Sequence, residues 1–147
     1  VIDHLVPKDF KFSYRTVEFP YPLWFVSCLM QFPESETTTK SELKAMRDQR
    51  LKTQPLSQDT CGSVFKNPEK GHAGDYIERA GLKGHRIGGS SISTKHANFI
   101  VNEGNATSAN IEVLIKHVQS VVKTKFNVNL ETEVRIIGEK IHVDVKQ

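Results

Sequence analysis

One long apolar stripe constrains the fold of this 147-residue chain more than any other feature. Aliphatic residues between positions 111 and 122 recur three or four places apart, which puts them on a single face of an α-helix. These residues are Ile111, Leu114, Ile115, Val118, Val121 and Val122. The run Asn105-Ala106-Thr107 precedes the stripe and supplies the polar side chains that begin helices. The pattern therefore predicts a helix packed on the core, and the stripe is not a cofactor site.

Two more helices are predicted from their ends. Residues 73–80 form a short helical segment, followed by Gly81 in the position where helices often terminate and by Leu82, which folds back as an apolar closure. Threonines at residues 37–39 offer N-cap hydroxyls for a helix that runs to about Lys52.

The strand predictions rest on branched and aromatic residues. Residues 23–32 form the longest apolar run and predict a buried strand, and residues 92–101 predict another. Residues 134–137 and 141–145 predict a hairpin joined through residues 138–140. Together the elements predict an α+β fold, a two-layer sandwich in which helices cover one face of a mainly antiparallel sheet.

Composition excludes several classes of protein. The apolar run at residues 23–32 is far shorter than a membrane span of ~18 residues, so no membrane segment is expected. The net charge of +3 agrees with an anionic ligand, but it is too small and dispersed to indicate nucleic-acid binding. Cys28 and Cys61 form neither a disulfide framework nor a zinc pattern, and they fit a reducing cytoplasm. No metal site is predicted, because no histidine or carboxylate spacing suits one.

The segment Thr60-Cys61-Gly62-Ser63-Val64-Phe65-Lys66-Asn67-Pro68 carries the chemistry. Gly62 lets the backbone approach a ligand closely, and Pro68 biases the residue before it toward extended geometry. A turn of small residues thus presents the Ser63 hydroxyl beside an aromatic ring, a cation and an amide. The alternative on composition alone is a strand end followed by a polar turn.

This segment resembles the Gly-Ser-x-Phe-(Lys/Arg)-Asn-Pro motif of the UDP-N-acetylenolpyruvoylglucosamine reductase (MurB) family. Other stretches are similar to further motifs of that family, in the same order, over residues 10–138. They are Phe12-Ser13-Tyr14-Arg15, the run from Ala73 to Gly84, Arg86-Ile87-Gly88-Gly89, the run from Ser93 to Asn102, and Glu133-Val134-Arg135-Ile136-Ile137-Gly138.

The resemblance implies an oxidoreductase of peptidoglycan precursor synthesis, and hence of cell wall biogenesis, cell shape and cell division. Such an enzyme uses NADPH and FAD to convert UDP-N-acetylglucosamine enolpyruvate to UDP-N-acetylmuramate in the cytoplasm. In that family a FAD-binding portion precedes the Tyr-Arg motif. Residues 1–20 are accordingly expected to be a lead-in from the flavin domain, and residues 21–147 to be the C-terminal substrate-binding domain. With the N-terminal FAD-binding portion missing, the chain alone is expected to be inactive.

The resemblance also assigns catalytic residues. Ser63 would donate a proton, Glu133 would lie near the substrate carboxylate, and Arg15 would supply the cation between them. From the residues alone, Ser63 could instead stabilise its turn, Glu133 could be a solvated carboxylate at a sheet edge, and Arg15 could be a surface charge.

Further residues would contact the substrate or the cofactor. By resemblance, the substrate would be bound by Tyr14, Arg50, Lys66, Asn67 and His96. Gly88 and Gly89 would allow close approach of the flavin. A rival hypothesis is a stand-alone UDP-sugar binding module without redox activity. A small nucleic-acid binder is disfavoured, because the aromatic residues do not alternate with lysines along one face.

Overall fold

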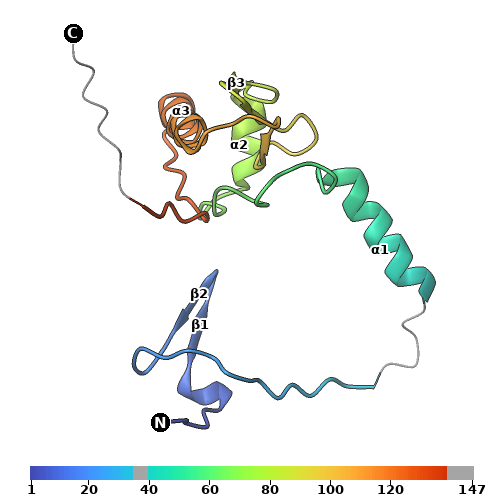
Figure 1. The fold of residues 1–147 in the computed structure, drawn as a ribbon, viewed down its shortest axis with the longest axis vertical. Coiled ribbons are helices and arrows are strands. Elements are labelled where there is room, and N and C mark those ends of the chain that lie inside the picture. The colour runs from blue at the N-terminus through green and yellow to red at the C-terminus, as the bar shows by residue number, and fades with distance from the viewer. Residues whose placement is uncertain (35–39, 139–147) are drawn as a thin grey trace. The chain divides into compact units, whose positions relative to one another are not determined.

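The computed structural model describes residues 1–34 and 40–138. The chain divides into two compact units, Val1–Thr39 and Lys40–Gln147, which are described separately here (Figure 1). The predicted boundary between residues 20 and 21 concerns the domains of a full-length protein, and it stays a prediction.

The first unit is built around a small hairpin. A 3₁₀ turn, η1, spans Pro7–Asp9, and strands β1 (Lys11–Ser13) and β2 (Thr16–Glu18) pair antiparallel with Ser13 opposite Thr16. Tyr14 and Arg15 therefore form the two-residue turn between the strands. Ring centroids of Phe10 and its aromatic neighbours lie 6.0 Å apart, so aromatic contacts hold this unit together.

The prediction of a buried strand at residues 23–32 is wrong. This segment has no regular secondary structure, and its large side chains face outward: Trp24 is 94% exposed, Leu29 101% and Phe32 74%. A strand is stabilised by a ladder partner and by burial, and the described residues of this unit provide neither for this segment.

The second unit begins with helix α1 (Lys40–Thr53), which has no buried residue. The predicted N-cap threonines at residues 37–39 lie outside the described residues. Helix α2 (Ala73–Arg79) confirms the predicted short helix and its ending. Gly81, at φ +80°, donates to Glu78 O at 2.8 Å, and Leu82 N donates to Ile77 O at 3.2 Å, which is a Schellman motif.

Three short antiparallel strands follow in the order β3 (Arg86–Ile87), β4 (Ser90–Ile92) and β5 (Ile100–Asn102). Helix α3 (Ser108–Phe126) contacts both β3 and β4, and α2 contacts α3 (Figure 1). The sheet and both helices thereby enclose one core, which contains Phe65, Ile77, Ile92 and Leu114 among its fully buried side chains.

The predicted strand at residues 92–101 is instead two strands separated by a turn. The Ser93 hydroxyl accepts hydrogen bonds from the backbone N–H groups of Lys95 and His96, at 3.2 and 3.3 Å. These local bonds favour a turn over a continuous ladder. His96 consequently lies in the turn between β4 and β5, not in the middle of a strand.

Helix α3 (Ser108–Phe126) confirms the helix predicted from the apolar stripe. Thr107 is its N-cap and accepts from the backbone N–H of Asn110 at 3.2 Å, and Asn127 closes it in the left-handed region at φ 56°. The residues Leu114, Ile115, Val118 and Val122 of the stripe are buried.

The prediction of a strand at residues 134–137 is wrong, because this segment has no strand and residues 135–138 are exposed. The ladder in this region is limited to a single bridge between Phe65 and Thr132. The other half of the predicted hairpin, residues 141–145, lies outside the described residues. The α+β class and the antiparallel pairing are confirmed.

None of the helices within residues 1–34 and 40–138 is long and apolar enough to cross a membrane.

Candidate functional site

Ser63 lies in a segment held from both sides. On one side Ser63 bridges Phe99, and the backbone N–H of Val64 donates to Asn98 O at 2.9 Å. On the other side the backbone N–H of Glu133 donates to Val64 O at 2.8 Å. The segment carrying Ser63 and the segment carrying Glu133 are therefore direct neighbours, although they are far apart in the sequence.

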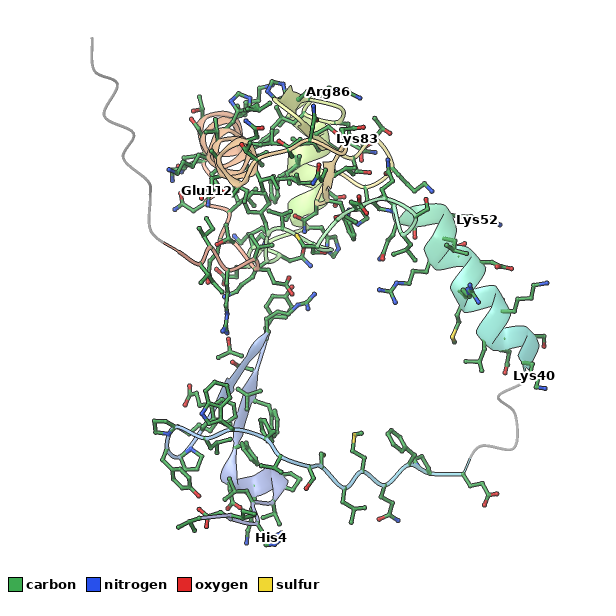
Figure 2. The ribbon with its side chains drawn as sticks, in the orientation of Figure 1. His4, Lys40, Lys52, Lys83, Arg86 and Glu112 are labelled. Carbon is green, nitrogen blue, oxygen red and sulfur yellow. The ribbon has the colours of Figure 1, made fainter. Side chains whose placement is uncertain are left out.

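Ser63 and Glu133 line the same open hollow of about 1030 Å³. Its wall comes from the Ser63 segment, β5, the first turns of α3 and residues 133–138. Figure 2 shows Glu112, a lining residue, on α3, whereas Lys83 and Arg86 lie on the other side of the same unit. The structure thus brings together two of the three predicted catalytic residues.

The charged groups of the hollow are mostly acidic. Asp59, Glu112 and Glu133 line it, and Arg135 is the one cation among its described lining residues. An anion entering this hollow would meet like charges, which a nearby cation would offset. Arg135 lines the hollow, and sequence reasoning had not selected it. Its position in the same motif as Glu133, two residues further on, was the available signal.

Lys66 and Asn67 do not line this hollow, and both have partners within the chain. Lys66 forms an ion pair with Glu131. The Asn67 side-chain oxygen accepts a hydrogen bond from the backbone N–H of Ala73 at 3.1 Å, at the first residue of α2. The amide of Asn67 therefore satisfies one of the donors that a helix N-terminus leaves unpaired.

His96 is half-buried and packs edge-on against Phe99, with ring centroids 4.8 Å apart. Its Nδ1 accepts a hydrogen bond from the backbone N–H of Asn98 at 3.2 Å, so the neutral ring carries its proton on Nε2. Burial lowers the pKa of His96 below its ordinary value of 6.5, and the positive charge of Lys83 lowers the pKa further. His96 is therefore favoured as a neutral imidazole at neutral pH.

Gly88 and Gly89 form the two-residue turn between β3 and β4, where Gly88 adopts a positive φ of 55°. A Cβ on Gly88 would lie 2.4 Å from Asn110 Oδ1, and a Cβ on Gly89 would lie 2.5 Å from the backbone nitrogen of Ala106. Because neither glycine has a Cβ, the N-terminus of α3 and the loop before it can pack directly against this turn. The flavin contact assigned to them stays a prediction.

The remaining predicted residues lie elsewhere. Tyr14 and Arg15 belong to the first unit, where the Arg15 guanidinium lies 6.0 Å from the Tyr14 ring centroid. Arg15 adopts φ 57°, a conformation that is uncommon for residues other than glycine. Arg50 is exposed on α1, and its Nε donates to Gln54 Oε1 at 3.1 Å.

Within the described ranges no three histidine, cysteine or carboxylate side chains gather as metal ligands. Cys61 lines the hollow as a free, exposed thiol.

The fold and the hollow define a small α+β domain with one open hollow described on its surface, and comparisons with known proteins give its family. A family model described as "UDP-N-acetylenolpyruvoylglucosamine reductase, C-terminal domain" matches residues 54–137. The crystal structure of the UDP-N-acetylenolpyruvylglucosamine reductase (MurB) from Thermus caldophilus is similar, with a TM-score of 0.54 and 36% identity over 66% of this chain and 35% of that one. The chain belongs to the UDP-N-acetylenolpyruvoylglucosamine reductase family.

Relatives of that name are similar over most of this chain. The protein from Alkalilimnicola ehrlichii is 45% identical over 90% of this chain and 45% of its own length. The protein from Methylococcus capsulatus is 46% identical over 90% of this chain and 44% of its own length. A protein from Bacillus licheniformis is 40% identical over 95% of this chain and 77% of its own length. The chain thus spans less than half the length of the first two relatives.

Proposed function

We propose that this chain is the substrate-binding and proton-donating portion of a reductase of peptidoglycan precursor synthesis. The substrate is UDP-N-acetylglucosamine enolpyruvate and the product is UDP-N-acetylmuramate. The observation that carries the proposal is the shared hollow of Ser63 and Glu133, in a chain of the UDP-N-acetylenolpyruvoylglucosamine reductase family.

Ser63 is the proposed proton donor. When bound, FAD reduced by NADPH would supply a hydride to the terminal carbon of the enolpyruvyl double bond. The inner carbon must then gain a proton: the Ser63 O–H bond breaks, a C–H bond forms, and the serine oxygen regains a proton from solvent. A hydroxyl is a weak acid, but an enolate is basic enough to take its proton when the two are well aligned.

Charge balance in the hollow assigns roles to two arginines. The reaction builds negative charge on the substrate carboxylate, close to Glu133, and a nearby cation stabilises that charge. Arg135 lines the hollow from within the second unit. Arg15 is proposed for the same role by the family resemblance, and the hairpin turn holds it in a left-handed backbone conformation at φ 57°. Backbone strain of this kind is often retained at functional sites.

The other predicted residues would hold the nucleotide part of the substrate. Arg50, Lys66 and Tyr14 offer a cation or a hydroxyl for the diphosphate and the sugar, and a charged hydrogen bond to phosphate is strong. His96, favoured as a neutral ring, offers a donor without adding charge. The side-chain oxygen of Asn67 already accepts from Ala73 N at the N-terminus of α2. Its proposed contact with the substrate would therefore use the side-chain NH₂ group.

FAD is proposed to be held mainly by a portion of the enzyme that precedes the residues matched by the C-terminal family model. Gly88 and Gly89 are proposed to lie near the flavin, although the space where a Cβ would stand is occupied by the chain's own Asn110 and Ala106. Residues 1–53 precede the matched range 54–137, yet the Alkalilimnicola ehrlichii relative aligns over 90% of this chain. The proposed division keeps residues 1–20 as a lead-in from the flavin-binding portion and residues 21–147 as the C-terminal substrate-binding domain.

The exposed segment at residues 23–32 is suited to contact with the flavin-binding portion. Its exposed side chains include the apolar residues Trp24, Val26, Leu29 and Met30. A contiguous set of exposed apolar side chains is typical of a contact surface. We propose that the flavin-binding portion covers this segment. The free thiols of Cys28 and Cys61 agree with a cytoplasmic location for the enzyme.

The test separates the two half-reactions in the intact enzyme, in which the flavin-binding portion precedes this chain. Ser63→Ala should leave flavin reduction by NADPH nearly unchanged. It should slow flavin reoxidation by the enolpyruvyl substrate by about 10²–10⁴, the range for a lost general acid. Ser63→Cys should retain more activity than Ser63→Ala, because a thiol is also an acid.

Stopped-flow absorbance of the flavin measures both steps. Equal slowing of both half-reactions, or of neither, rules out Ser63 as the donor. The isolated chain with added FAD should show no turnover, and turnover there would contradict the need for a flavin-binding portion. Affinity for UDP in an intact protein that binds no flavin would point instead to a UDP-sugar binding module.

A further inference from the structure

Asn98 makes an unusual set of contacts with the segment that carries Ser63. Its side-chain Oδ1 accepts a hydrogen bond from the backbone N–H of Phe65 at 3.0 Å. Its Nδ2 donates to the backbone oxygen of the same residue at 2.8 Å. A single side chain thereby satisfies both backbone groups of Phe65, as a neighbouring strand would.

The position of Asn98 makes these contacts consequential. Asn98 is only 5% exposed, and its own backbone oxygen accepts from Val64 N at 2.9 Å. The regular ladder around Ser63 is minimal, because it consists of the isolated bridges of Ser63 with Phe99 and of Phe65 with Thr132. Side-chain bonds from Asn98 therefore replace the strand pairing that would otherwise fix this segment.

Through Val64, the contacts of Asn98 extend to the segment that carries Glu133. The Val64 oxygen accepts from the backbone N–H of Glu133 at 2.8 Å. Asn98 thus holds the backbone of the residues that separate Ser63 from the Glu133 segment. Precise positioning of the reacting groups is important, because a misplacement of 1 Å can lower the rate by about 10²-fold.

We propose that Asn98 is a positioning residue that sets the Ser63 hydroxyl against Glu133 for proton delivery. This inference rests on the proposed function. The role requires an amide, because only an amide side chain presents a donor and an acceptor side by side in one plane. An ionised carboxylate would accept from Phe65 N but offer no donor to Phe65 O. A protonated carboxyl would restore both bonds.

That difference gives a signature that a purely structural role lacks. In the intact enzyme, Asn98→Asp should slow flavin reoxidation by the enolpyruvyl substrate by about 10² at pH 8, and leave flavin reduction by NADPH unchanged. As the pH falls toward 5.5, the rate relative to the unaltered enzyme should recover, because the carboxyl becomes protonated. His96, whose Nδ1 contacts the Asn98 backbone, and Lys83, which lowers the pKa of His96, face this position in both proteins, so each rate is compared with that of the unaltered enzyme at the same pH.

Ser93→Ala is the matched control. Ser93 is buried in the same turn, and its hydroxyl accepts from the N–H groups of Lys95 and His96, not from Phe65. This variant should lower the melting temperature while the substrate half-reaction keeps its rate. A second variant, Asn98→Ser, covers the case in which Asn98→Asp does not fold. Its hydroxyl is one bond shorter than the amide and cannot satisfy both backbone groups of Phe65, so this variant should slow the substrate half-reaction alone.

Each outcome decides the matter. Slowing confined to the substrate half-reaction, with recovery at low pH for Asn98→Asp, supports the inference. Normal reoxidation in a folded Asn98→Asp or Asn98→Ser variant overturns it, as does equal slowing by Ser93→Ala. If the unaltered intact protein fails to transfer electrons to the enolpyruvyl substrate, the proposed function fails and the positioning role fails with it.

Discussion

Substitution of Asn67 separates a structural role from a substrate contact at the same residue. The Asn67 oxygen accepts from the backbone N–H of Ala73, whose residue is 0% exposed, so Asn67→Ala leaves a buried donor without its partner. Loss of a helix cap costs about 0.5–2 kcal/mol, and burial of the donor places this site in the upper half of that range. In a domain of this size each kcal/mol lowers Tm by roughly 4–8 °C.

Asn67→Asp keeps the accepting oxygen and adds a negative charge near the N-terminus of α2, where the helix dipole favours it. Its free energy of unfolding, measured by urea denaturation of the chain, should therefore stay within about 0.5 kcal/mol of the unaltered protein. If Asn67→Asp proves as unstable as Asn67→Ala, the cap does not explain the residue.

Binding supplies the second half of the experiment. If Asn67 also contacts the diphosphate of the substrate, the charge in Asn67→Asp repels it. Affinity for UDP in the intact enzyme should then fall by about tenfold or more, although stability is preserved. Calorimetric titration with UDP measures this. Unchanged affinity in the aspartate variant would confine Asn67 to its structural role.

Three further predictions follow from burial and charge. Leu114→Ala, at a fully buried position of α3, should cost about 2–5 kcal/mol in urea denaturation, whereas Val113→Ala, 52% exposed on the same helix, should cost less than about 0.5. Because the pKa of His96 is lowered in the folded state, its contribution to stability is complete above about pH 6.5 and is lost as the pH falls below that value. The unaltered protein should therefore lose more stability between pH 7.5 and 5.5 than His96→Gln, and parallel curves would contradict this. Trp24, the single tryptophan, is 94% exposed, so its fluorescence should be that of a solvated indole in this chain and should shift to shorter wavelength when the flavin-binding portion is attached.

Local signals in the sequence were sufficient where the determining contacts are local. The apolar stripe of α3 repeats at helical spacing, and burial of Leu114 and Val118 follows from that spacing alone. The ending of α2 was equally predictable, because Gly81 supplies the positive φ that a Schellman motif requires.

The prediction failed where distant or side-chain contacts decide the structure. Residues 23–32 have the composition of a buried strand, but composition cannot say whether neighbouring strands are present. Residues 92–101 carry strand-forming side chains, yet hydrogen bonds to the Ser93 hydroxyl turn the chain between β4 and β5.

The candidate site was likewise predictable only in part from the sequence. The motif around Ser63 pointed to the segment, and the structure places Ser63 and Glu133 on one hollow. The sequence did not reveal the role of Asn98, because its partner, the backbone of Phe65, leaves no trace in residue identities. An amide within the otherwise apolar run from Ala97 to Val101 was the only hint.

The exposure of α1 has a consequence for the reach of the chain. Its 14 residues bury no side chain, and an isolated helix of that length is marginal in water. As a helix it spans about 21 Å, and fully extended about 46–50 Å. The helix–coil equilibrium of α1 thus sets the distance that the chain can bridge between residues before Lys40 and residues after Thr53.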